Sequence, residues 1–242
     1  MNGNENIVLK LIRQLSSPNA ETRENAAIHI FQGLNNKTLP ITPKLFSALT
    51  DALDDDYTNV VHYAALSIAY IADKGRDMAS AIPKLGRTLN DVLDSDDIDL
   101  AEDLVGALLN ASKKGNDLST TVDVIAKALF YSYDSKGMFL RHGSSQSIMQ
   151  YINHFIGRKV ETGDYDSALV KIKKITNAVM GASKDKKTKH IKERREILGT
   201  LSMLTNSIRV RMNMVDKNKK KFPVKRQEVI RQTAKKAVRI CH

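Results

Sequence analysis

The chain has 242 residues, of which 42% are hydrophobic, so it holds enough apolar side chains to build a core and is not wholly disordered. Its single cysteine, Cys241, excludes a disulfide framework and a four-cysteine zinc site, and is typical of a reducing, cytoplasmic compartment. The first residues lack the charged and apolar regions of a secretory signal, and no stretch has the ~18 apolar residues that a transmembrane helix needs. We therefore expect a cytoplasmic protein with no transmembrane segment.

Charge is distributed unevenly along the chain. Residues 1–120 contain 11 Lys and Arg against 17 Asp and Glu, whereas residues 161–242 contain 22 against 8. This asymmetry indicates two different surfaces, an acidic one for a protein partner and a basic one for an anionic partner. The alternative is that the two halves neutralise each other, within one molecule or between molecules.

The first two thirds of the chain contain an internal repeat. Residues 43–45 (Pro-Lys-Leu) recur 40 residues later at 83–85. The first unit is shorter, since the alanine pair at 26–27 recurs at 64–65, 38 residues on. A fixed period of this length is typical of stacked helical repeats.

Each unit is predicted to contain two helices joined by a polar turn. In the first unit, apolar residues at helical spacing from Ile7 to Leu15 predict a helix, and residues 16–19 (Ser-Ser-Pro-Asn) predict the turn. Ser, Asp and Asn suit this place because their side chains accept the free amides at the start of the next helix. Gly75 and Gly115, each after a lysine, are predicted helix C-caps.

Residues 21–27 (Glu-Thr-Arg-Glu-Asn-Ala-Ala) place an arginine shortly before paired alanines, and this segment resembles the second helix of a HEAT repeat. Units two and three resemble it less, because His62 and Glu102 stand near the place of the arginine. The resemblance covers roughly residues 6–157. It implies an all-α fold, a right-handed α-solenoid of about four HEAT-like helix pairs plus C-terminal helices. It also implies a non-catalytic scaffold or adaptor that binds protein or nucleic acid, and it carries over no functional residue.

We divide the chain into a HEAT-like repeat array, residues 1–160, and a basic C-terminal helical extension packed on the array, residues 161–242. A long helix is predicted from about residue 189 to 215, with Ile197, Met203, Val210 and Met214 on a second apolar side. A helix that is apolar on two sides is expected to pack between neighbours. Residues 217–221 are predicted to form a basic loop, and residues 225–240 a last helix.

The last predicted helix carries cations at a spacing of four residues, which can follow a phosphate backbone of DNA or RNA. Few aromatic residues lie nearby to stack on bases, so recognition of single strands is expected to be weak. The predicted nucleic-acid-binding residues are Lys219, Lys220, Lys221, Lys225, Arg226, Arg231, Lys235, Lys236 and Arg239.

A smaller candidate site lies in the fourth unit. Residues 141–145 (Arg-His-Gly-Ser-Ser) place polar residues where the earlier units have apolar ones. The favoured interpretation is a degenerate final repeat with a wetter face. The alternative is an anion site formed by Lys136, Arg141 and His142.

No glycine-rich phosphate loop and no histidine pattern of a metal site occurs, so we expect no cofactor, no bound metal and no enzymatic activity. One alternative is a HEAT-like DNA glycosylase, a DNA-repair enzyme, with Tyr131, Tyr133, Tyr151 and Asp134 as its aromatic and acidic residues. The chain has no tryptophan, on which such sites rely, and we favour tyrosines that seal the fourth unit against the C-terminal helices. A second alternative is a protein held at a membrane surface by its basic helices.

Overall fold

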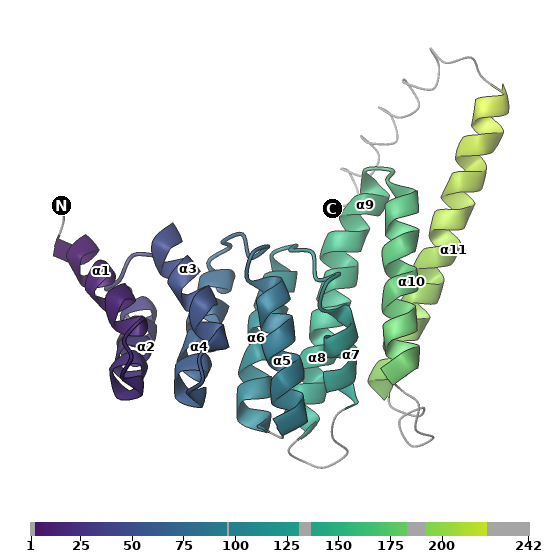
Figure 1. Cartoon of the computed structure of the whole chain (residues 1–242). Helices are drawn as coiled ribbons and strands as arrows, with labels where there is room; N and C mark the ends of the chain where they lie inside the picture. The colour runs from purple at the N-terminus through teal and green to yellow at the C-terminus, as the bar shows by residue number, and fades with distance from the viewer. Residues whose placement is uncertain (1–2, 96, 131–136, 183–191, 222–242) are drawn as a thin grey trace.

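The structure is a computed structural model that describes residues 3–95, 97–130, 137–182 and 192–221. These residues contain helices and no strands, and the helices follow one another in pairs along the chain (Figure 1). The predicted fold class, an all-α solenoid, is confirmed. The helices are α1 (Gly3–Leu15) and α2 (Ala20–Asn35); α3 (Pro43–Asp51), extended by the 3-10 turn η1 (Ala52–Asp54), and α4 (Thr58–Asp73); α5 (Ile82–Ser95) and α6 (Ile98–Lys113); α7 (Val122–Leu129) and α8 (Gly137–Gln150), extended by the π-helical segment η2 (Tyr151–Ile156) and by α9 (Gly157–Glu161); and α10 (Tyr165–Ala182) and α11 (Lys192–Lys221).

Side-chain caps begin several of these helices. The Asn19 side chain accepts a hydrogen bond from Thr22 N at 2.8 Å, and the Thr42 hydroxyl accepts one from Leu45 N at 3.1 Å. Gly75 and Gly115 follow the ends of α4 and α6 with φ of +78° and +80°. This left-handed conformation costs glycine little, so both predicted C-caps are confirmed.

The helices form two layers. The second helix of each pair, α2, α4, α6 and α8, packs against its counterpart in the next pair, and α1, α3, α5 and α7 form the other layer. The alanine pairs lie buried between the layers, where their small side chains allow close approach; they are Ala26 and Ala27, and Ala64 and Ala65. The repeat period therefore places equivalent residues side by side along each layer.

The C-terminal helices continue the same stack. Helix α10 packs beside α7, and α11 packs beside α10 and α8 (Figure 1). One side of α11 is buried through Ile197, Leu201 and Ile208. The second apolar side is mostly not covered by described residues, because Met203, Val210 and Met214 are 71%, 52% and 59% exposed. The expectation that α11 packs between neighbours on both sides is wrong within the described chain.

Residues 217–221 also differ from the prediction, because they are the last turn of α11 and not a loop. Lysine is a good helix former, so a run of lysines continues a helix that has already begun.

The polar segment 141–145 is helical and inward-facing where it is described. Ser144 and Ser147 are fully buried, and Ser145 is nearly so. A Cβ atom at Gly143 would lie 3.0 Å from Val105 Cγ1 on α6, which shows how closely α8 approaches that helix. The expectation of a wetter face is therefore wrong, since small polar residues serve here for tight helix packing.

Candidate functional site: an acidic face on the second helices

Consecutive second helices are linked by contacts between side chains that are mostly half-buried. Asn59 Nδ2 on α4 donates to Glu24 Oε1 on α2 at 2.7 Å. His62 Nδ1 on α4 lies 2.8 Å from Asp103 Oδ2 on α6, an oxygen that has no other hydrogen-bond partner among the described residues. These contacts join α2, α4 and α6 into one continuous surface, which we name the second-helix face.

The second-helix face is rich in carboxylates and poor in cations. Apart from Asp73, the last residue of α4, which pairs with Lys74, the acidic residues of these helices are Glu21, Glu24, Asp99, Glu102 and Asp103. Helices α2, α4 and α6 contain only two Lys or Arg residues, Arg23 and Lys113, and Lys113 is the last residue of α6. This face holds five of the 17 Asp and Glu residues on which the expectation of an acidic repeat surface rests.

Arg23 is not available to neutralise the second-helix face. Its Nε and Nη2 donate to Asp55 Oδ2 and Oδ1 at 2.7 and 2.9 Å, and its Nη1 donates to Ser17 O at 3.1 Å. Burial alone would raise the pKa of Asp55, but the hydrogen bonds from Arg23 and Tyr57 N and the charge of Arg23 together outweigh it, and the pKa is lowered. The hydrogen bond to Asp55 also raises the pKa of Arg23. The arginine of the HEAT-like segment therefore joins the first repeat to the second.

Two neighbouring carboxylates on α6, Glu102 and Asp103, have raised pKa values. Burial raises the pKa of Glu102, and the charge of Asp99 raises it further. Burial also raises the pKa of Asp103; the charge of His62 lowers it, and the surrounding acids raise it again. A cation brought to this face would lower both pKa values, so the face is suited electrostatically to a basic partner.

Aromatic side chains lie beside the carboxylates. The Phe31 and Tyr63 rings pair across α2 and α4 with centroids 6.1 Å apart, and Tyr70 lies further along the same side of α4. Lys74 Nζ is 4.8 Å from the Tyr70 ring centroid, so this ring already contacts a cation of the chain, and the partly exposed Phe31 and Tyr63 rings are the ones open to a partner. The face thus offers both carboxylates and ring surfaces to Lys or Arg side chains.

Sequence reasoning predicted an acidic surface but did not name its residues. The repeat register supplies the missing signal, because Glu24, His62, Glu102 and His142 follow one another at intervals of 38 to 40 residues. Equivalent residues of stacked repeats lie side by side, so the repeat period of 38 to 40 residues is enough to predict that these four residues lie in one row.

A second polar cluster links the third, fourth and fifth helix pairs. Tyr151 OH donates to Asp117 Oδ1, and Lys171 Nζ donates to Asp117 Oδ2, both at 2.7 Å. Burial raises the pKa of Tyr151 strongly, and the hydrogen bond to Asp117 raises it further, so the hydroxyl stays protonated. For Tyr151, the interpretation as a residue that seals the fourth unit against the C-terminal helices is confirmed, since Lys171 is on α10. Tyr131, Tyr133 and Asp134 lie outside the described residues.

The residues predicted to bind anions fall mostly outside the described part of the chain. Lys219, Lys220 and Lys221 are in the last turn of α11. Lys136, Lys225, Arg226, Arg231, Lys235, Lys236, Arg239 and the side chain of Arg141 lie outside it. His142 is exposed on α8, with Nε2 2.7 Å from Gln146 Nε2. The nucleic-acid site and the anion site therefore stay predictions.

Metal sites and membrane-spanning helices are both absent from the described residues. No three His, Cys, Asp or Glu side chains among them are placed to hold a metal ion. None of the helices in this part of the chain combines the length and the hydropathy needed to cross a membrane.

Comparison with known proteins gives similarities of fold. No family model matches the chain, and no curated protein matches it. A solved designed armadillo repeat protein is 19% identical with a TM-score of 0.49, covering 83% of this chain and 87% of that one. An engineered protein solved by the Northeast Structural Genomics Consortium is 18% identical with a TM-score of 0.46, covering 84% of this chain and 98% of that one. A second engineered protein from the same consortium is 19% identical with a TM-score of 0.43, covering 83% of this chain and 99% of that one. This chain is similar to them as a stack of helical repeats.

Proposed function

We propose that the protein is a non-catalytic, HEAT-type scaffold that binds a basic segment of a protein partner on its second-helix face. The proposal rests mainly on the charge imbalance of this face. It has five carboxylates, and Arg23, a cation of α2, does not neutralise them because it is bound to Asp55. Burial and the neighbouring acids raise the pKa of Glu102 and Asp103, and the positive charge of a basic segment would lower both pKa values again. Binding therefore releases protons, and it is expected to weaken as the solution is acidified.

The arrangement of the carboxylates suggests the spacing of the partner's cations. Packed helices lie about 8–10 Å apart, so the acids of α2 and those of α6, two repeats away, are separated by about 16–20 Å. An extended peptide rises about 3.3 Å per residue. A partner with two basic clusters about five or six residues apart fits Glu24 at one end and Asp99 and Glu102 at the other.

A labelled 14-residue peptide with two Lys-Arg pairs six residues apart tests the proposal by fluorescence anisotropy. The variant E24Q/D99N/E102Q removes three charges without breaking an ion pair seen in the described residues. At about 0.2–1 kcal/mol for each exposed pair, the loss should be roughly threefold to 100-fold in affinity.

The matched control is D91N/E161Q/D166N, which removes three exposed carboxylates away from the second-helix face. It should change the affinity by less than about twofold. Equal losses in both variants would mean that only net charge matters, and the proposal of a specific face would fail.

The anionic partner proposed for the basic last third is nucleic acid, supported by the 22 Lys and Arg against 8 Asp and Glu in residues 161–242. About four to six phosphate contacts would give a slope of roughly −4 to −5 for log affinity against log salt. The variant R231Q/K235Q/K236Q/R239Q should weaken binding to duplex DNA or RNA and flatten this slope. Its matched control, K10Q/R13Q/K113Q/K114Q, removes four exposed cations elsewhere and should do neither.

The same preparations address the two alternative functions. Release of bases from alkylated DNA would favour the glycosylase, although Tyr151 of its candidate residues is buried and bonded to Asp117. Salt-dependent binding to vesicles with anionic lipid, without binding to duplex nucleic acid, would favour a membrane-surface protein.

A further inference from the structure

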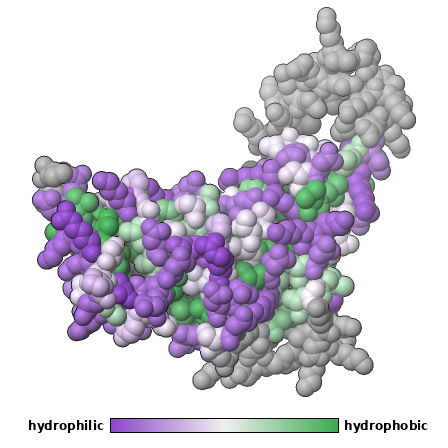
Figure 2. Space-filling view, viewed as in Figure 1, coloured by the Kyte–Doolittle hydropathy of each residue, from purple (hydrophilic) through white to green (hydrophobic). Residues whose placement is uncertain are grey.

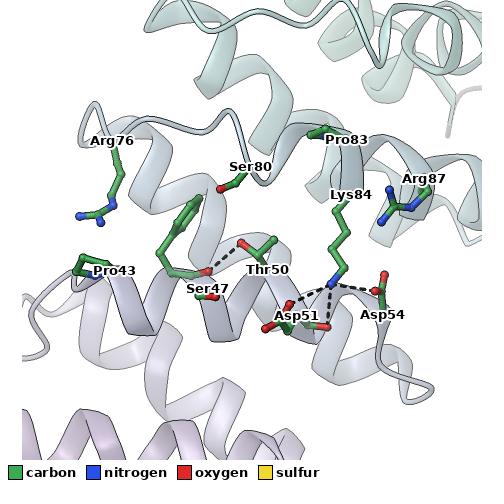
Figure 3. A pocket seen from close by; sticks show the side chains of 11 residues that line it. Pro43, Ser47, Thr50, Asp51, Asp54, Arg76, Ser80, Pro83, Lys84 and Arg87 are labelled. Carbon is green, nitrogen blue, oxygen red and sulfur yellow. Dashed lines mark hydrogen bonds and ion pairs between the residues drawn. The ribbon is translucent and has the colours of Figure 1, made fainter.

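A groove runs between α3 and α5 on the first-helix layer, away from the second-helix face. One cavity of about 480 Å³ is lined by residues of both helices and of the loop before α5 (Figure 3). A second cavity of about 620 Å³ shares Phe46, Arg76 and Ser80 with it, so the two form one continuous groove. Cavities of about 300–1,000 Å³ accept ligands larger than a single small ion.

Two carboxylates of this groove, Asp51 and Asp54, already have a cation. Lys84 Nζ lies 2.9 Å from Asp54 Oδ2 and 3.4 Å from Asp51 Oδ1 (Figure 3). The Lys84 side chain is only 13% exposed, so its charge is directed to these two acids and not to solvent. The charge that the groove can offer to a ligand therefore comes from its other charged residues.

Two arginines line the groove without a carboxylate partner among the described residues. The Arg76 guanidinium lies 5.8 Å from the Phe46 ring centroid, and Arg87 is exposed on α5. Figure 3 shows them toward opposite ends of the groove, with Ser80 and Ser47 between them. Stacking on a ring holds a guanidinium in place while its N–H groups stay free to bind an anion.

We propose that this groove binds an acidic peptide segment, with one carboxylate held by Arg76 and another by Arg87. Planar guanidinium groups bind carboxylates through two parallel hydrogen bonds, which suits side chains of Asp or Glu. The Ser47 and Ser80 hydroxyls lie between the arginines and can donate to the peptide backbone. A continuous polyphosphate fits less well, because its charges would pass Asp51, Asp54 and Asp77, whereas a peptide can place its carboxylates at the two arginines alone.

The test uses a labelled 12-residue peptide with Glu at every third position and Ala and Leu between, together with its Gln counterpart. Fluorescence anisotropy with the full chain at about 0.1 M salt, where the Debye length is ~10 Å, reports mainly close contacts. The Glu peptide should bind and the Gln peptide should not. The variant R76Q/R87Q should lose at least tenfold in affinity, while R76K/R87K, which keeps the charge but not the paired hydrogen bonds, should lose less.

The matched control is K10Q/R13Q, which removes two cations of the same layer, exposed on α1. It should stay within about twofold of the unaltered protein, and circular dichroism should show equal helicity for all variants. Unchanged affinity in R76Q/R87Q, equal binding of the Gln peptide, or competition by duplex DNA that depends on Arg76 and Arg87 would each overturn the proposal. The E24Q/D99N/E102Q variant should bind the Glu peptide normally, so this site and the second-helix face can fail separately.

Discussion

Two glycines inside helices should respond in opposite ways to replacement by alanine. Alanine in a helix interior is favoured over glycine by about 0.5–1 kcal/mol, because glycine loses more backbone freedom on folding. At Gly106 on α6, no heavy atom lies within 4 Å of an added Cβ, so Gly106→Ala should gain this amount. At Gly86 on α5, the added Cβ would lie 2.4 Å from Thr121 Cγ2 and 3.1 Å from Thr121 Cβ.

The cost at Gly86 follows from how Thr121 is held. Non-bonded carbon atoms prefer about 3.5–4.0 Å, so Thr121 must move by about 1 Å. Thr121 is buried at the start of α7, and its hydroxyl donates to Leu118 O at 3.1 Å, so movement disturbs both packing and this hydrogen bond. Overpacking of this kind costs about 1–3 kcal/mol, which after the helical gain of about 0.5–1 kcal/mol leaves a net destabilisation of about 0–2.5 kcal/mol for Gly86→Ala.

Urea unfolding followed by circular dichroism measures both changes. In a chain of this size, 1 kcal/mol corresponds to about 2–4 °C in Tm. Because repeats contact mainly their neighbours, hydrogen exchange should place the loss at Gly86 in α5 and α7. Thr121→Ser removes the Cγ2 atom and should recover part of the loss in the double variant. If Gly86→Ala stabilised the protein as Gly106→Ala does, the close contact between α5 and Thr121 would be refuted.

Three further predictions concern the fourth and fifth helix pairs. Tyr151→Phe should cost about 1.5–3 kcal/mol, unlike Tyr57→Phe with its exposed ring, because it removes a hydrogen bond to the Asp117 carboxylate. Burial raises the pKa of Asp117, but the hydrogen bonds that it accepts, first among them those from Lys171 and Tyr151, together lower it. These hydrogen bonds therefore stabilise the fold above about pH 3.9, and their contribution is lost as the pH falls further. Urea titrations of Tyr151→Phe and of the unaltered protein should accordingly converge in acid. Ser144→Ala should raise stability by about 1–2 kcal/mol, against about 0.5 for the exposed Ser202→Ala, since Ser144 Oγ is buried and has no hydrogen-bond partner among the described residues; equal gains in thermal melts would contradict this. A chain ending at Ala182 lacks Ile197, Leu201 and Ile208, so the apolar surface of α8 and α10 that they cover becomes exposed. This chain should lose solubility and bind a hydrophobic dye, whereas full solubility with an unchanged Tm would show that α11 is dispensable.

The sequence alone determined the local structure of the repeats. The apolar spacing, the alanine pairs and the capping residues act within a few positions of one another, so helix pairs and their ends follow from short-range physics. The left-handed Gly75 and Gly115 are examples, since only the conformation of one residue is involved. The charge count likewise predicted an acidic repeat surface without any knowledge of packing.

The tertiary structure alone decided which of these residues meet. Arg23 reaches Asp55 across 32 positions, and Lys171 reaches Asp117 across 54, and both contacts depend on how far each repeat is rotated and shifted against the next. The same stacking buries Ser144 against α6 and leaves Met203 of α11 exposed, although polarity alone suggests the reverse. Periodicity fixes which side of a helix is apolar, but the neighbour that covers that side is set by the whole stack.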